Sequence, residues 1–139
     1  MKTTKEITLI AIATAIAGIA IGIAVDRVAF AQQPGITRTI LQKADDPGSV
    51  KYEAVMAVAE IPPGAQSGKH THPGIELAYV LDGTVTVERE GQAPVTLNAG
   101  DHVQNVGVVH NARNPGTKPV KILAVYIVEK GKPLAEPAK

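Results

Sequence analysis

The chain has 139 residues, enough for about one domain, and its 14 Lys and Arg residues nearly balance its 13 Asp and Glu residues. This balance argues against a nucleic-acid-binding protein, which usually carries a basic face or stripe. A sequence without cysteine has no disulfide framework, no thiolate metal site and no cysteine nucleophile.

The first segment of note is an apolar run, residues 7–25, which carries no charge and follows Lys2 and Lys5. Residues 29–31, Ala-Phe-Ala, come after it, and this order is typical of a secretory signal peptide. We therefore expect residues 1–31 to be cleaved off on export. The run has 19 residues and is also long enough to span a bilayer as an uncleaved anchor. Either alternative places the folded part outside the cytoplasm.

From residue 50 onward, short β-rich runs alternate with turns. The predicted strands are residues 50–61, 76–81, 84–90, 95–97, 102–106 and 120–128. Strands at this spacing indicate an all-β sandwich or barrel, and no helical periodicity longer than two turns follows residue 32. We expect an extended N-terminal arm at residues 32–49, a β-barrel at residues 50–130 and a C-terminal tail at residues 131–139.

Three histidines of this part form a pattern with one carboxylate: His70, His72 and His110 with Glu76. Residues i and i+2 of a strand project from the same face, so His70 and His72 can reach one ion. The Pro-Gly pair that follows bends the chain and lets Glu76 return to that ion, and His110 adds a third imidazole from a distant strand. Three imidazoles and a carboxylate suit a divalent first-row metal and leave one or two positions open for water or substrate.

The remaining polar candidates match no ligand position. We expect His102 to be exposed or to lie beside the metal ligands, and Gln104 to point the same way as a hydrogen-bond donor to a ligand. Arg113, three residues after His110, is a candidate for meeting a carboxylate substrate, but a solvated cation at a strand edge is the better interpretation. No residue is identified as a catalytic acid or base.

These residues resemble the two sequence motifs of the cupins. The first motif reads Gly64-x5-His70-x-His72-x3-Glu76-x6-Gly83. The second reads Gly107-x2-His110-x3-Asn114 and resembles the end of the second cupin motif. The front of the second motif departs from the family, because Asn105 stands where a proline is usual and Gly100 is one residue closer to it.

The resemblance implies a jelly-roll barrel (a double-stranded β-helix) with a metal held by His70, His72, Glu76 and His110. The metals that cupins commonly bind are Mn, Fe, Ni, Cu, Co and Zn. The resemblance also implies a homodimer paired through its sheets, and it places the chain in an exported, periplasmic bacterial subgroup.

For function, the resemblance implies an exported mononuclear-metal cupin that acts on a small oxygen-containing molecule, as an oxygenase, isomerase or decarboxylase. A non-catalytic, metal-stabilised module that binds a small ligand is the alternative, because fold alone does not decide function. Aromatic residues make up only 3% of the chain, which weakens sugar stacking as a binding mode. We therefore expect a small-molecule partner, no nucleic acid, and a membrane tether only if residues 7–25 are retained.

Overall fold

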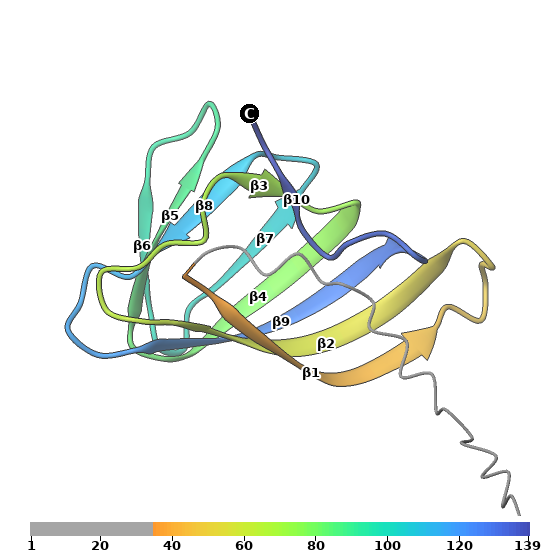
Figure 1. Cartoon of the computed structure of the whole chain (residues 1–139), viewed down its shortest axis with the longest axis horizontal. Helices are drawn as coiled ribbons and strands as arrows, with labels where there is room; N and C mark the ends of the chain where they lie inside the picture. Colours follow the sequence, from red (N-terminus) through yellow and green to blue (C-terminus); the bar gives the residue numbers. More distant parts are fainter. Residues whose placement is uncertain (1–34) are drawn as a thin grey trace, which may run out of the picture.

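The computed structural model describes residues 35–139, which form two five-stranded antiparallel sheets facing each other (Figure 1). Sheet A, in spatial order, contains β1 (Thr37–Asp45), β2 (Tyr52–Ile61), β9 (Val120–Glu129), β4 (Gly74–Asp82) and β7 (His102–Val106). Sheet B, in spatial order, contains β10 (Glu136–Pro137), β3 (His70–Thr71), β8 (His110–Arg113), β5 (Thr84–Arg89) and β6 (Val95–Asn98). Spatial neighbours are often distant in sequence, because the chain crosses between the sheets as in a jelly roll.

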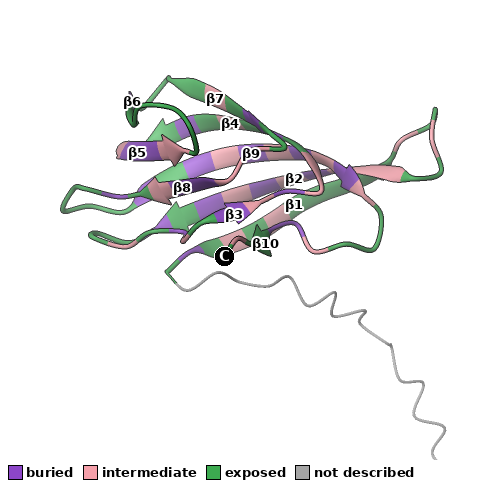
Figure 2. Ribbon diagram, turned by 90° about the horizontal axis from the view of Figure 1, so that it is seen from above, coloured by how far each residue is buried: buried purple, intermediate pink, exposed green. Residues whose placement is uncertain are grey.

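The core lies between the sheets, and β9 shows how the sequence builds it. Its residues 120, 122, 124, 126 and 128 are buried, whereas the residues between them are exposed or half-buried (Figure 2). Successive side chains of a strand point to opposite faces, so alternation along β9 gives sheet A one apolar inner face. Val120 and Ile122 of this face share an apolar cluster with Val85, Val87 and Leu97 of sheet B.

The all-β, jelly-roll prediction is confirmed by this architecture. The six predicted strands correspond to β2, β4, β5, β6, β7 and β9, with ends that differ by at most two residues. The strands β3 and β8 are not among those predicted. They have two and four residues and are rich in His and Asn, so they show no apolar alternation.

Both ends of the described chain differ from the expected domain boundaries. In sheet A, β1 pairs with β2 from Thr37 opposite Glu60 to Asp45 opposite Glu53. In sheet B, β10 pairs with β3. The expected arm, residues 32–49, and the expected tail, residues 131–139, therefore contribute strands to the two sheets, and the barrel extends beyond residues 50–130.

Within residues 35–139, no helix is long and apolar enough to cross a membrane. The apolar run at residues 7–25 and the expected signal peptide or anchor at residues 1–31 lie outside the described residues.

Candidate metal centre

Three buried histidines meet between the two sheets. His70 of β3 lies opposite His110 of β8 in the pairing of these strands, and His72 directly follows β3. The ring centroid of His70 is 4.9 Å from that of His72 and 4.2 Å from that of His110. One ring nitrogen of each histidine lies within 4.8 Å of the other two. This group of imidazoles can hold a metal ion.

Each imidazole is oriented by a main-chain carbonyl group. The Nδ1 atoms of His70 and His110 lie 2.9 and 3.1 Å from the carbonyl oxygen two residues earlier, and Nδ1 of His72 bonds the carbonyl of Leu134. A carbonyl oxygen only accepts hydrogen bonds, so each Nδ1 carries the proton and donates it. In a neutral ring the Nε2 atom then keeps its lone pair, which is the state a metal ligand needs.

Glu76 reaches the histidines from sheet A. Its Oε2 atom lies 3.2 Å from Nε2 of His72 and 3.3 Å from Nε2 of His110. The chain returns from His72 to Glu76 through Gly74, where φ is +157° and a Cβ atom would lie only 2.0 Å from the carbonyl oxygen of Ile127. Glycine at this position therefore lets β4 lie directly against β9 and brings the carboxylate to the cluster.

The electrostatics of the cluster favour a neutral His70 and an ionised Glu76. Burial, with help from the neighbouring His110, lowers the pKa of His70 to about 3. Burial alone would raise the pKa of Glu76, but the adjacent His110 and His72 side chains hold it well below its ordinary value. At neutral pH, His70 and Glu76 are therefore in the protonation states that bind a cation.

The donor atoms fit a divalent ion. Nε2 of His72 is buried and has no hydrogen-bond partner among the described residues. Because its Nδ1 carries the proton, this Nε2 and the Glu76 carboxylate are both acceptors, and they face each other at 3.2 Å. Two acceptors at this distance repel each other unless a proton or a metal ion lies between them. The donor set of nitrogen and oxygen atoms suits a first-row transition metal.

Sequence reasoning gave no role in the site to Asn105 of β7. Its Nδ2 atom donates a hydrogen bond of 2.7 Å to Oε2 of Glu76, and both side chains are buried. Glu76 and Asn105 lie directly opposite each other in the pairing of β4 and β7. The available signal was the position itself, where asparagine replaces the proline usual in the second cupin motif.

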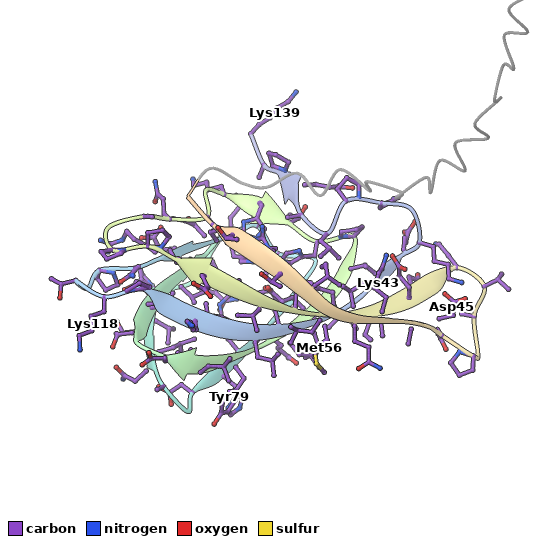
Figure 3. All side chains as sticks on the ribbon, turned by 60° about the horizontal axis from the view of Figure 1, so that its bottom comes forward. Lys43, Asp45, Met56, Tyr79, Lys118 and Lys139 are labelled. Carbon is purple, nitrogen blue, oxygen red and sulfur yellow. The ribbon has the colours of Figure 1, made fainter. Side chains whose placement is uncertain are left out.

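The structure does not bring His102 and Gln104 to the cluster. Along β7, Val103 and Asn105 line the interior, whereas His102 and Gln104 are exposed on the outer face of sheet A. Tyr79, which pairs with His102, points away from the molecule in Figure 3. The sequence predicted strand β7 correctly but not which of its side chains point inward. Successive side chains of a strand point to opposite faces, so an error of one residue exchanges the inner and outer sets.

The histidine cluster opens into a cavity of about 40 Å³ between the sheets. This volume suits several water molecules or one molecule of a few heavy atoms. The wall is mainly aliphatic and includes seven polar side chains: Arg38, Ser67, His70, Glu76, Asn105, His110 and Tyr126. Arg113 does not line this cavity and instead lies 3.9 Å from Glu88 on sheet B.

Tyr126 of β9 joins the cluster from the floor of sheet A. Its ring centroid is 5.0 Å from that of His72, and its side chain is almost fully buried. Burial, with help from the adjacent Glu76 carboxylate, raises the pKa of Tyr126 well above its usual range. The hydroxyl group therefore stays protonated at neutral pH and is able to donate a hydrogen bond.

Solved structures with the same fold include two bacterial proteins of similar length. A conserved protein with a double-stranded β-helix domain from Klebsiella pneumoniae is 24% identical, with a TM-score of 0.59 over 76% of this chain and 86% of that one. A cupin-like protein from Thermotoga maritima is 24% identical, with a TM-score of 0.58 over 74% of this chain and 75% of that one. These similarities show the fold.

The DMSP lyase DddQ from Ruegeria pomeroyi is 26% identical, with a TM-score of 0.55 over 66% of this chain and 46% of that one. Among curated proteins, none matches this sequence. The family described as the cupin domain matches residues 57–126, which is half of the 139 residues. The match includes all four residues of the cluster, the His-x-His pair, Glu76 and His110, and the chain belongs to the cupin family.

Proposed function

We propose that this chain is an exported mononuclear-metal cupin that acts on a small oxygen-containing molecule. His70, His72, Glu76 and His110 bind one divalent ion, which is Mn, Fe, Ni, Cu, Co or Zn. The observation that supports this most directly is the convergence of their buried donor atoms, with Oε2 of Glu76 only 3.2 and 3.3 Å from two imidazole Nε2 atoms. A divalent ion between these atoms would stabilise such a contact between acceptors.

The residues around the ligands are suited to a small substrate. A bound ion of this kind supplies Lewis-acid polarisation of a substrate oxygen. The aliphatic wall offers water few polar partners, Tyr126 presents a protonated hydroxyl group, and Asn105 donates a hydrogen bond to the carboxylate of Glu76. The reaction class is that of an oxygenase, isomerase or decarboxylase. The similarity to a DMSP lyase is consistent with a small-molecule substrate.

One observation favours the alternative, a non-catalytic module that binds a small ligand. Glu76 is the one carboxylate among the described residues that line the cavity, and its Oε2 atom is already engaged by Asn105 and two histidines. The described wall of the cavity therefore offers no second carboxylate as a general base. Binding of a small ligand does not need such a base, whereas many catalytic mechanisms do.

The proposal includes location and assembly. The apolar run at residues 7–25, if it is retained, tethers the domain to the membrane on the periplasmic side, and otherwise it is removed with residues 1–31. The domain pairs as a homodimer through the outer face of a sheet.

Metal analysis of the full chain tests the proposed site. We expect one transition-metal ion per chain in the wild type and none in the His70→Ala/His110→Ala double variant. His102→Ala, which removes an exposed imidazole, is the matched control and should retain the metal. A wild-type protein that folds but binds no metal would overturn the proposal.

A second measurement separates the enzyme from the binding module. The metal-loaded chain is incubated with small diketones, phenols and hydroxy acids, and oxygen uptake and product formation are followed. Turnover that is lost in the double variant supports the enzyme. Binding of one of these compounds without turnover supports the module.

A further inference from the structure

The first strand brings a cation to the cavity. Arg38 of β1 lies opposite Ala59 of β2, and directly opposite residues of an antiparallel pair share a face of the sheet. Both residues line the cavity, whereas the neighbours of Arg38 in β1, Thr37 and Thr39, are exposed. Because β1 is a paired strand of sheet A and not a loose arm, the backbone of Arg38 has a fixed place beside the cavity.

The charge of Arg38 affects the pKa values of two side chains at the site. Burial and His110 are the main causes that lower the pKa of His70, and Arg38 lowers it further. Burial and Glu76 raise the pKa of Tyr126, and Arg38 opposes this shift. Arg38 lines the same cavity as His70 and Tyr126, so its side chain belongs to the wall that the histidine cluster also forms.

The charges in the wall do not cancel once a divalent ion is bound. Apart from the histidines, Arg38 is the one basic side chain and Glu76 the one acidic side chain among the described residues that line the cavity. The Glu76 carboxylate is directed at His72, His110 and Asn105. When these groups bind a divalent ion, the mainly aliphatic cavity keeps a net positive charge. A small anion is the kind of molecule that neutralises this charge.

We infer that Arg38 makes this cavity selective for a small carboxylate with a second oxygen on the adjacent carbon. The inference deepens the proposed function and rests on it. The planar fork of a guanidinium group matches a carboxylate, so Arg38 binds the carboxylate while the second oxygen faces the histidine cluster. The volume of about 40 Å³ limits the ligand to a few heavy atoms and excludes phosphorylated sugars.

The test compares glycolate with glycolamide, which have nearly the same shape but differ in charge. Binding to the full chain is measured by isothermal titration calorimetry, with Co²⁺ bound and without metal. We expect the wild type to bind glycolate at least about tenfold more tightly than glycolamide, because a charge-assisted bidentate contact is made only with the carboxylate. We expect R38Q to reduce this preference to about onefold and R38K to retain part of it.

R113Q is the matched control, because Arg113 is a sheet B arginine that does not line the cavity. It should keep the wild-type preference. Thermal melting of each variant shows that it is folded, and the ratio of the two affinities is unaffected by a uniform loss of folded protein.

The outcomes separate the inference from the proposed function. Metal binding with equal affinity for glycolate and glycolamide in the wild type overturns the role of Arg38 and leaves the metal site standing. A preference that survives in R38Q also overturns it. If the wild-type chain binds no metal, the proposed function is refuted. The ratio of the affinities for glycolate and glycolamide, measured on that metal-free chain, still decides whether Arg38 selects carboxylates.

Discussion

At the scale of single residues, the hydrogen bond from Asn105 to Glu76 explains how a carboxylate is held in a mainly aliphatic interior. We predict that Asn105→Ala lowers metal affinity by about 10- to 100-fold, as expected for loss of a group that orients a ligand. The reason is that Oε2 of Glu76 loses its 2.7 Å donor and becomes less well positioned. Competition with a chromophoric chelator measures the affinity.

Gln104→Ala provides the control for this prediction. Gln104 is the neighbour of Asn105 in β7 but is exposed on the outer face, so its loss should leave metal affinity unchanged. If Asn105→Ala binds metal as tightly as the wild type, or if both variants weaken binding equally, Asn105 does not position Glu76.

The two kinds of site residue differ in how far the sequence predicts them. His70, His72, Glu76 and His110 follow from motif spacing, because spacing along the chain sets which residues meet at a turn or on a face. Asn105 depends instead on the register between β4 and β7, which places it opposite Glu76. Register is set by packing over the whole sheet, so sequence analysis assigned the supporting role to the wrong face of β7.

The ionisation of the site predicts how pH affects the metal-free protein. His70 has a pKa of about 3 when folded and about 6.5 when unfolded, so the unfolded chain binds more protons between these values. The free energy of unfolding should therefore fall as pH drops from about 6.5, by up to about 1.4 kcal/mol per pH unit for this group. Below about pH 4.5, protonation of Glu76 in the unfolded chain adds to the loss, because the pKa of Glu76 is lowered on folding.

Urea unfolding at several values between about pH 7 and pH 5 measures this slope. The His70→Gln variant lacks the titrating group and should show a smaller slope. An equal slope in both proteins would mean that His70 is not held neutral by the fold.

At the scale of secondary-structure elements, the strands that sequence analysis missed are the ones without apolar alternation. Most residues of β1 are exposed, and its register with β2 is interrupted by a bulge between Ile40 and Gln42. The other missed strand at an end, β10, has two exposed residues. Edge strands expose one side to solvent, so their sequences carry a weak signal even though pairing fixes their place.

The C-terminal segment nevertheless supports the metal ligands. The Leu134 carbonyl accepts the hydrogen bond from Nδ1 of His72, and the Leu134 side chain is buried beside Tyr126. We predict that deletion of residues 132–139 lowers metal affinity by about 10-fold or more, because His72 loses the group that orients its ring. Chelator competition measures the affinity, and thermal unfolding measures the accompanying loss of stability.

Leu134→Ala separates these two effects. The substitution empties a buried position and should lower the free energy of unfolding by about 2–5 kcal/mol. The main-chain carbonyl remains, so metal affinity at a temperature where the variant is folded should stay near the wild-type value. A deletion variant that binds metal normally would show that this carbonyl does not orient His72.

At the scale of the whole molecule, the inner and outer faces of sheet A carry different kinds of side chain. The inner face carries Glu76, Asn105 and Tyr126 toward the cluster. The outer face of β4 presents Leu77, Tyr79 and Leu81, each with 46–48% of its surface exposed. Figure 3 shows Tyr79 directed outward beneath this sheet. A row of large apolar side chains on a sheet is typical of an interaction surface.

This row is where the proposed homodimer is expected to pair. We predict that a Leu77→Lys/Leu81→Lys variant is monomeric where the wild type is dimeric, because like charges on a self-paired surface repel and the apolar contact is lost. Sedimentation equilibrium measures the mass, which should fall by about half. Val50→Lys, a change at a loop residue that is 94% exposed, is the control and should remain dimeric. Since the two leucines point away from the cavity, the double variant should keep its metal, whereas an unchanged mass would show that the outer face of β4 is not the dimer contact.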